Sequence, residues 1–348
     1  MANQLRRNLG HRPLLARVRR GGAARGDCGI RQAQPQVRRT QRIGFAVLRW
    51  RLLIGTIVVA ALAGLCWLDA HAARPGMYLA PLALGASLLA AGEIIRLGKA
   101  RGVEPIGAAV YLAAALPVAA SSAPVFVDSI GMKTDAVAGV ANMAQLGWLA
   151  AGLIAGLVVA LLAEMRRFDE PGRAGASLAL ATLAVLYVGG LVGMLVQLRL
   201  VRGVTGPLGL APLATMIAAV KLSDTCQYFV GKSVGRTKLA PRLSPGKTWE
   251  GTLGGIGLAV VLIAVTMPLL VDEGSFVFTR ALRWGAYALA VAIAGLLGDL
   301  GESLLKRDAQ VKDSSDWLPG FGGVLDMLDS LLLAAPVAYL CWAAGLLA

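Results

Sequence analysis

Residues 303–330 carry charged side chains that could bind a phosphate group and a divalent cation together. The segment contains three basic residues, five aspartates and four serines, yet it lies between two long apolar runs. Asp299 stands just before it, where the first run ends, and Asp326 and Asp329 stand where the second begins. Helical side chains three residues apart share a face, so Asp326 and Asp329 would point the same way.

The cost of placing carboxylates near hydrocarbon suggests what they do. An uncompensated carboxylate in a membrane helix costs roughly 2.5 to 3.5 kcal/mol on insertion scales. If Asp299 closes one helix and Asp326 opens the next, a hairpin brings them together at one membrane interface. Clustered carboxylates without histidine suit a hard cation such as Mg²⁺, and Lys306, Arg307 and Lys312 between them suit phosphate. The alternative is that these charges form interfacial salt bridges and topology anchors.

A second charged segment, residues 221–255, offers complementary groups. It begins with Asp224 in an apolar helical context, continues through several basic residues and reaches the stretch SPGKTWEG at 244–251. A turn of Gly, Ser, Thr and Lys before a helix can present backbone N–H groups, hydroxyls and an ammonium to a phosphate chain. The segment is not a Walker A loop, because Pro241 stands where the first glycine should fall.

Membrane helices must position these segments. Hydrophobic residues make up 57% of the chain and charged residues 16%, and several runs approach the roughly 20 apolar residues that span a bilayer. We predict an all-α polytopic integral membrane protein with about nine transmembrane helices and cytoplasmic active-site loops. The predicted spans are 52–68, 77–95, 105–120, 140–163, 174–198, 207–230, 252–271, 284–299 and 328–347.

Most of the net charge of +14 belongs to the N-terminal segment, because residues 1–51 hold 13 arginines and one aspartate. We expect residues 1–48 to form a disordered basic tail and residues 49–348 to form one membrane domain, with its motifs in 221–330. The tail could touch membrane lipids, act as a topology signal or reflect an upstream start codon. We do not expect it to bind nucleic acid.

The same charge pattern orients the chain. With the tail in the cytoplasm, the positive-inside rule places the basic connections 231–250 and 300–327 there as well, in the compartment that holds nucleotides. Only Arg199 and Arg202, in an opposite connection, fit this topology poorly. The only histidines are His11 and His71, so the chemistry should need little proton transfer. A lipid phosphate monoester attacking a nucleotide meets this condition, since the nucleophile is already anionic.

These two segments resemble the signature motifs of the phosphatidate cytidylyltransferase family. The later signature is matched by Ser303, Lys306, Arg307, Lys312, Asp313, Ser315, Leu318, Pro319, Gly322, Gly323, Asp326 and Asp329. The earlier one is matched by Asp224, Tyr228, Phe229, Gly231, Gly235, Lys238, Leu239, Pro241, Ser244, Pro245, Lys247, Thr248, Glu250 and Gly251.

The resemblance implies that CTP and phosphatidic acid react to give CDP-diacylglycerol and pyrophosphate. It implies that the reaction requires Mg²⁺, which a second cation could assist. It implies a homodimer, with Asp299 and Asp326 as metal ligands. We expect the protein to lie in a bacterial inner membrane, because the chain is compact and shows no organellar targeting features. Within the two motifs we also assign catalytic roles to Lys306, Arg307 and Asp329. We assign substrate binding to Asp224, Lys238, Ser244, Lys247, Thr248, Glu250, Ser303, Lys312 and Asp313.

Three positions depart from the family pattern. Phe321 replaces the signature histidine, Met327 replaces the arginine between the aspartates, and Gln227 stands where the family has alanine. Two alternatives therefore stay open: a CTP-dependent polyprenol or phytol kinase, and a non-catalytic divergent membrane homologue.

Two further expectations concern the membrane helices. Glu93, near the end of the second span, is either an interfacial charge that snorkels to water, which we favour, or a packing partner for a basic site residue. Gly189, Gly190 and Gly193 should allow close helix packing.

Overall fold

The structure is a computed structural model, and the residues that it describes all belong to one compact unit, residues 53–348. The predicted tail, residues 1–48, lies outside the described residues. Those are 55–72, 74–127, 138–169, 171–201, 209–271, 278–315 and 322–347.

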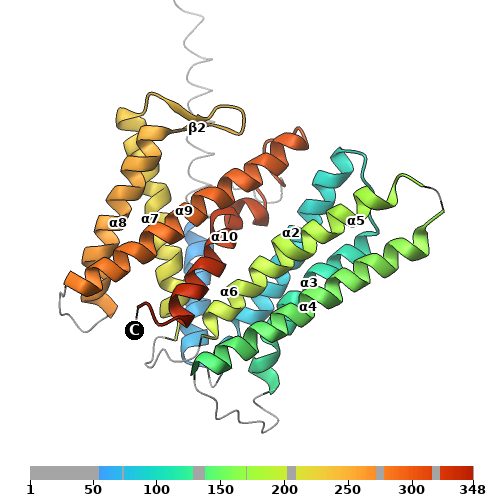
Figure 1. Ribbon diagram of the computed structural model, residues 1–348, viewed down its shortest axis with the longest axis horizontal. Coiled ribbons are helices and arrows are strands. Elements are labelled where there is room, and N and C mark those ends of the chain that lie inside the picture. Colours follow the sequence, from blue (N-terminus) through green and yellow to red (C-terminus); the bar gives the residue numbers. More distant parts are fainter. Residues whose placement is uncertain are drawn as a thin grey trace, which may run out of the picture. The chain divides into compact units, whose positions relative to one another are not determined.

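The unit consists of helices and one short β-hairpin (Figure 1). After a first helix, Gly55–Ala70, the helices are α2 (Leu79–Ala100), α3 (Gly107–Val127), α4 (Ala138–Arg167), α5 (Ala174–Leu183), the π-helix η2 (Ala184–Gly190), α6 (Leu191–Arg199), α7 (Ala211–Val234), α8 (Trp249–Val271), α9 (Phe278–Asp308) and α10 (Val324–Ala343). The hairpin strands are β1 (Lys238–Ala240) and β2 (Ser244–Thr248).

Seven helical segments among the described residues are long and apolar enough to cross a membrane, with α5, η2 and α6 forming one of them. This confirms a polytopic helical membrane protein, but not the count of nine. The predicted span 52–68 begins before the described residues, and its described helix is short. The span predicted at 207–230 corresponds to α7, which turns polar from Lys221 onward.

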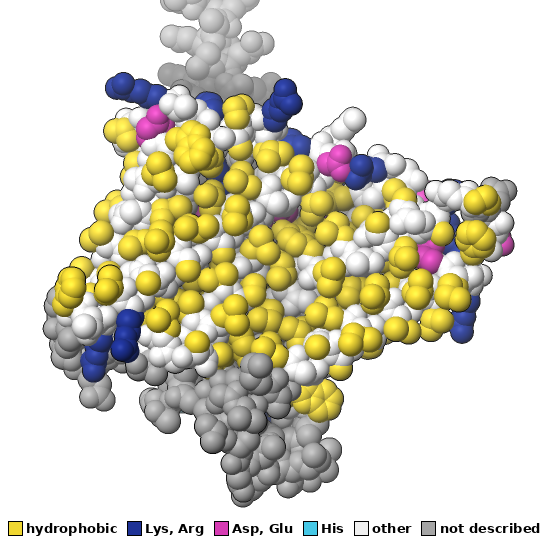
Figure 2. Space-filling view, viewed as in Figure 1, with side chains coloured by type: hydrophobic (Ala, Val, Ile, Leu, Met, Phe, Trp, Pro, Cys, Tyr) yellow, Lys and Arg dark blue, Asp and Glu magenta, His cyan; other side chains and the backbone are white. Residues whose placement is uncertain are grey.

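The apolar surface supports the same conclusion. Figure 2 shows apolar side chains over the middle of the face in view and basic side chains toward its edges. On α8, Leu253 and Leu270 are 65% and 74% exposed. Such a continuous apolar surface suits lipid rather than water.

Two apolar cores organise the helices. The first lies among α2, α3, η2 and α6, and the second lies among α7, α8, α9 and α10. Helix α10 packs against α9 and also against α6, so it joins the two cores (Figure 1). Glycines permit the closest approaches: a Cβ on Gly189 would lie 2.5 Å from the backbone oxygen of Ala114, and one on Gly193 would lie 2.7 Å from Leu149. The packing role expected for these glycines is confirmed.

The structure corrects two boundaries. Helix α9 continues to Asp308, so Asp299 lies within the helix rather than closing it. The residues after Asp299 are amphipathic, and an apolar run marks only the lipid-facing part of a helix. The stretch SPGKT, expected as a turn, forms strand β2, in which Thr248 pairs with Lys238 and Ser244 pairs with Ala240.

The misfit of Arg199 also has a structural explanation. Its side chain is buried, and its Nε donates to Asp69 Oδ2 at 2.7 Å. Asp69 also accepts the backbone N–H groups of Gly76 and Tyr78. The Arg199 charge is therefore neutralised inside the protein by a buried carboxylate.

Candidate active site

Lys306 forms the electrostatic centre of the signature segment. Its Nζ lies 2.6 Å from Asp326 Oδ1 and 2.7 Å from Glu302 Oε2. The exposed fractions of the Lys306, Asp326 and Glu302 side chains are 14%, 11% and 0%. Glu302 stands one helical turn before Lys306 on α9, whereas Asp326 lies in the first turn of α10. One ammonium therefore ties the two helices together through two poorly solvated carboxylates.

Asp326 has further partners within the protein. Its Oδ2 accepts the backbone N–H of Gly323 at 2.7 Å and that of Ser314 at 2.9 Å. The bond to Gly323 provides an acceptor at the start of α10, where backbone N–H groups have no partner inside the helix. The bond to Ser314 holds the preceding connection against this helix. The metal role predicted for Asp326 stays a prediction.

A cluster of three carboxylates lies beside this pair. Ligand atoms of Asp299, Glu302 and Asp329 lie within 4.8 Å of one another. Asp299 and Glu302 are three residues apart on α9, so they share a face, and α10 supplies Asp329. The two helices meet at Gly298, where a Cβ would lie 2.3 Å from the backbone oxygen of Asp329. Only glycine permits this approach, which brings Asp299 beside Asp329.

The chemistry of this cluster fits a divalent cation. Carboxylate oxygens are the ligands that Mg²⁺ takes from proteins. Glu302 Oε1 is buried and has no hydrogen-bond partner among the described residues. Burying an oxygen without a partner costs free energy unless a ligand binds to it. Asp299, Glu302 and Asp329 are the residues that would hold the ion.

The hairpin places a second lysine at the cluster. Lys247, on β2, forms an ion pair with Asp299. The hairpin is fixed by Glu250, whose carboxylate accepts the backbone N–H groups of Arg236 and Thr237, both at 3.1 Å. Thr248 Oγ1 accepts the N–H of Gly251 at 3.2 Å and so caps the start of α8.

A cavity of about 400 Å³ opens between α7, β2, α8 and α9. Its lining residues are Asp224, Gln227, Tyr228, Gly231, Lys232, Gly246, Lys247, Thr248, Thr252 and Asp299. Four of the predicted site residues thus line one cavity. Asp299 belongs both to this lining and to the carboxylate cluster, so the cavity ends at the candidate metal site.

The remaining predicted residues lie at the periphery. Arg307 is exposed and its Nε donates to the backbone oxygen of Leu243 at 3.2 Å, which holds the hairpin against α9. Lys238, Lys312 and Asp313 are exposed, whereas Ser303 is buried and Ser244 is half-buried. Phe321 lies outside the described residues.

Sequence reasoning missed one carboxylate, Glu302, and misinterpreted another, Glu93. Glu302 follows Asp299 by three residues, and this spacing could have identified it. The interpretation favoured for Glu93 is wrong: its side chain is buried, and it accepts the backbone N–H groups of Val324 at 2.8 Å and Leu325 at 2.9 Å. A carboxylate at a helix N-terminus is stabilised by these donors and by the helix dipole. The other interpretation of Glu93, a packing partner for a basic site residue, is not supported by these bonds either, because both donors are backbone N–H groups.

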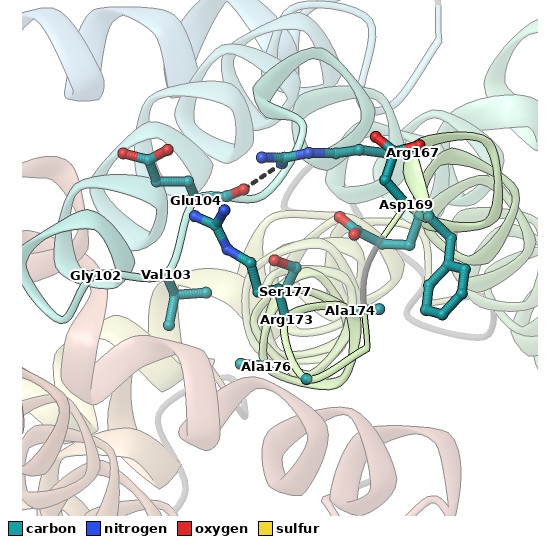
Figure 3. A pocket seen from close by; sticks show the side chains of 12 residues that line it. Gly102, Val103, Glu104, Arg167, Asp169, Arg173, Ala174, Ala176 and Ser177 are labelled. Atoms are coloured by element: carbon teal, nitrogen blue, oxygen red, sulfur yellow. Dashed lines mark hydrogen bonds between the residues drawn. The ribbon is translucent and has the colours of Figure 1, made fainter.

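A separate cavity of about 450 Å³ lies between the α2–α3 and α4–α5 connections (Figure 3). Arg167 donates there to the backbone oxygen of Glu104, and Asp169 and Arg173 also line it. None of the predicted site residues is among the residues that line this cavity.

Comparison with known proteins supports the motif analysis. Residues 49–344 match the model of a family described as the cytidylyltransferase family. The resemblance inferred from the two motifs is confirmed by this match.

Several curated relatives share part of the chain. Proteins named phosphatidate cytidylyltransferase are 40% identical over 146 residues in Brucella suis biovar 1, covering 41% of this chain and 51% of that protein, and 41% identical over 140 residues in Pseudomonas aeruginosa, covering 40% and 50%. The protein of that name from Bacillus subtilis is 36% identical over 172 residues, covering 49% and 58%. The chain thus spans about half the length of the curated relatives it matches.

Proposed function

Because the chain belongs to the cytidylyltransferase family, we propose that it transfers CMP from CTP to phosphatidic acid, giving CDP-diacylglycerol and pyrophosphate. One observation carries the proposal: a cavity lined by Lys247 and Thr248 ends at Asp299, within a cluster of three carboxylates. The names of the curated relatives support the choice of substrates.

The proposed reaction needs no histidine. An oxygen of the phosphatidic acid phosphate attacks the α-phosphorus of CTP, and the bond between that phosphorus and the pyrophosphate oxygen breaks. The nucleophile is already anionic, so catalysis rests on positioning and on charge neutralisation. A Mg²⁺ held by Asp299, Glu302 and Asp329 would supply part of that neutralisation. Replacement of the family histidine by Phe321 is compatible with this chemistry.

Side chains in and around the cavity would bind the triphosphate and hold the site's elements in place. Lys247 would leave Asp299 to pair with phosphate oxygens when the ion is bound, and the Lys232 ammonium would attract the triphosphate into the cavity. Thr248 and Glu250 keep the hairpin in place through their backbone bonds. Lys306 keeps α9 and α10 together and holds Asp326 and Glu302 in position.

The proposal includes the setting of the reaction. We place the active site on the cytoplasmic face of a bacterial inner membrane, because the basic connections that flank α8 and α9 would lie there with the nucleotide. A homodimer, implied by the resemblance, is part of the same proposal.

Product analysis tests the proposed reaction. Detergent-purified protein is incubated with CTP, Mg²⁺ and either phosphatidic acid or a polyprenol, and the lipid product is identified by mass spectrometry while pyrophosphate is measured. We expect one pyrophosphate per CDP-diacylglycerol, and no product from the polyprenol. A polyprenol monophosphate with CDP as the by-product would instead indicate a kinase, and absence of any product from folded protein would indicate a non-catalytic homologue.

A further inference from the structure

The cavity between the α2–α3 and α4–α5 connections lies at the ends of four membrane spans (Figure 3). The spans Leu79–Ala100 and Leu146–Arg167 end beside it, and the spans Gly107–Phe126 and Ala174–Arg199 begin beside it. The ends of membrane helices lie where hydrocarbon gives way to polar headgroups. The cavity volume of about 450 Å³ is within the range of small-molecule sites, roughly 300 to 1,000 Å³. Its place and size therefore suit a phospholipid headgroup.

Glu164 contributes a buried carboxylate to this cavity. It lies in the last turn of α4 and is only 8% exposed. It forms no hydrogen bond or ion pair with any described residue. Ser177, on α5, lines the same cavity and is 6% exposed, and its hydroxyl has no hydrogen-bond partner within the described ranges either. Burying such groups costs free energy unless a ligand binds to them.

Two arginines bring positive charge to the same cavity. Arg167 donates to the backbone oxygen of Glu104, and neither Arg167 nor Arg173 forms an ion pair with a carboxylate among the described residues. Figure 3 shows both side chains extending toward Glu104. Arg173 directly precedes α5, whose first turn has no side-chain cap and no acidic residue. Guanidinium groups and the free N–H groups of a helix N-terminus both favour phosphate.

An apolar surface on α4 leads away from the cavity. Leu157, Leu161 and Met165 are exposed and stand four residues apart, so they share one face of the helix. Phe168, which follows α4 and lines the cavity, is exposed as well. The acyl chains of a lipid could lie along this face while its headgroup occupied the cavity. A small soluble ligand would make no use of this surface.

We propose that this cavity binds the headgroup of a phospholipid with a primary ammonium group, as in phosphatidylethanolamine. The lipid phosphate lies at Arg173 and the N-terminus of α5, and the ammonium donates to Glu164 and Ser177. A primary ammonium has three N–H donors, whereas the quaternary ammonium of phosphatidylcholine has none. Phosphatidylglycerol has a phosphate but no cation for Glu164. This site is separate from the proposed CMP transfer and does not depend on it.

Native mass spectrometry of the detergent-purified full-length protein tests the lipid preference. The protein is titrated with phosphatidylethanolamine, phosphatidylcholine or phosphatidylglycerol, all with the same acyl chains. We expect the Kd for phosphatidylethanolamine to be about 10-fold or more below the other two, the scale of a hydrogen bond to a charged group. Free phosphoethanolamine should displace this lipid only at a much higher concentration, because it cannot contact the apolar face of α4.

Two substitutions test the two ends of the headgroup. Glu164→Gln keeps the size of the side chain and removes its charge, so it should raise the Kd for phosphatidylethanolamine by about 10-fold or more and leave that for phosphatidylglycerol unchanged. Arg173→Met should raise both Kd values, because both lipids carry the phosphate. The matched controls are Asp308→Asn and Arg166→Met, which change exposed residues outside the lining of the cavity. They should leave every Kd unchanged.

The unmutated protein alone can overturn the proposal, by binding the three lipids equally or by preferring phosphatidylglycerol. Displacement of phosphatidylethanolamine by an equal concentration of free phosphoethanolamine would overturn it too, since the ligand would then be a soluble molecule. An unchanged Kd for phosphatidylethanolamine in either Glu164→Gln or Arg173→Met would also contradict it. Weaker binding of this lipid in both variants, but in neither control, supports the proposal.

Discussion

The carboxylate of Glu93 on α2 accepts the backbone N–H of Leu325 on α10 at 2.9 Å. This bond joins residues that are 232 positions apart in the chain. The other oxygen of Glu93 accepts from Val324, and Ser314 Oγ lies 2.6 Å from the oxygen that bonds Leu325. Glu93 therefore fixes the start of the helix that carries Asp326 and Asp329.

Replacing Glu93 should loosen this helix start. Glu93→Ala removes the acceptors of two buried backbone N–H groups, and each buried group left without a partner costs about 1 to 3 kcal/mol. We expect a lower Tm in detergent and a loss of activity. Glu104→Ala, at an exposed glutamate in the next connection, is the control and should change neither. Equal Tm values for the two variants would contradict this role of Glu93.

Gly298→Ala should separate the carboxylates of the site. The added Cβ would meet the backbone oxygen of Asp329 at 2.3 Å, so α9 and α10 must move apart. We expect weaker Mn²⁺ binding and a large loss of activity. Gly301→Ala on the same helix provides the control, because a Cβ there meets nothing within 4 Å. If both variants bind Mn²⁺ like the unmutated protein, the helix contact does not set the site's geometry.

Lys306 should be important for folding as well as for activity. Lys306→Met would leave Glu302 and Asp326 without their cation, and removing one partner of a buried ion pair costs on the order of 3 kcal/mol. We expect a marked fall in Tm. Arg307→Met changes an exposed neighbour and should lower Tm much less. A Tm for Lys306→Met equal to that of Arg307→Met would show that the ion pairs contribute little.

Lys247 and Lys238 should differ in their effect on CTP. Lys247 lines the cavity and pairs with Asp299, whereas Lys238 is exposed on β1. Lys247→Met should raise the KM for CTP by roughly 10-fold or more, the scale of a lost hydrogen bond to a charged group. Lys238→Met should leave KM nearly unchanged. The opposite ranking would place the nucleotide along the outer side of the hairpin.

The apolar runs predict most membrane helices because a lipid-exposed helix must be apolar along its length. They do not predict where α9 ends, since its last turn, with Lys306, Arg307 and Asp308, is polar on one side. The span predicted at 207–230 is not confirmed, because α7, which carries Lys221 and Asp224, is not among the seven described helices that are long and apolar enough to cross a membrane.

The motifs identify the residue types of the site, but not which carboxylates meet. That depends on the contact of Gly298 with Asp329, which places Glu302 rather than Asp326 in the cluster. The role of Glu93 depends on a pairing between α2 and α10. Such long-range contacts leave no periodic signal in a single sequence.

The most direct test of the account uses CTP labelled at either the α- or the γ-phosphate, with phosphatidic acid and Mg²⁺. Purified unmutated protein is compared with Asp299→Asn and with Asp308→Asn, which changes an exposed aspartate on the same helix that pairs with Arg101. We predict chloroform-soluble label from α-labelled CTP alone, in the unmutated protein and Asp308→Asn but not in Asp299→Asn. Lipid label from γ-labelled CTP, or undiminished labelling by Asp299→Asn, would contradict the proposed CMP transfer at this site.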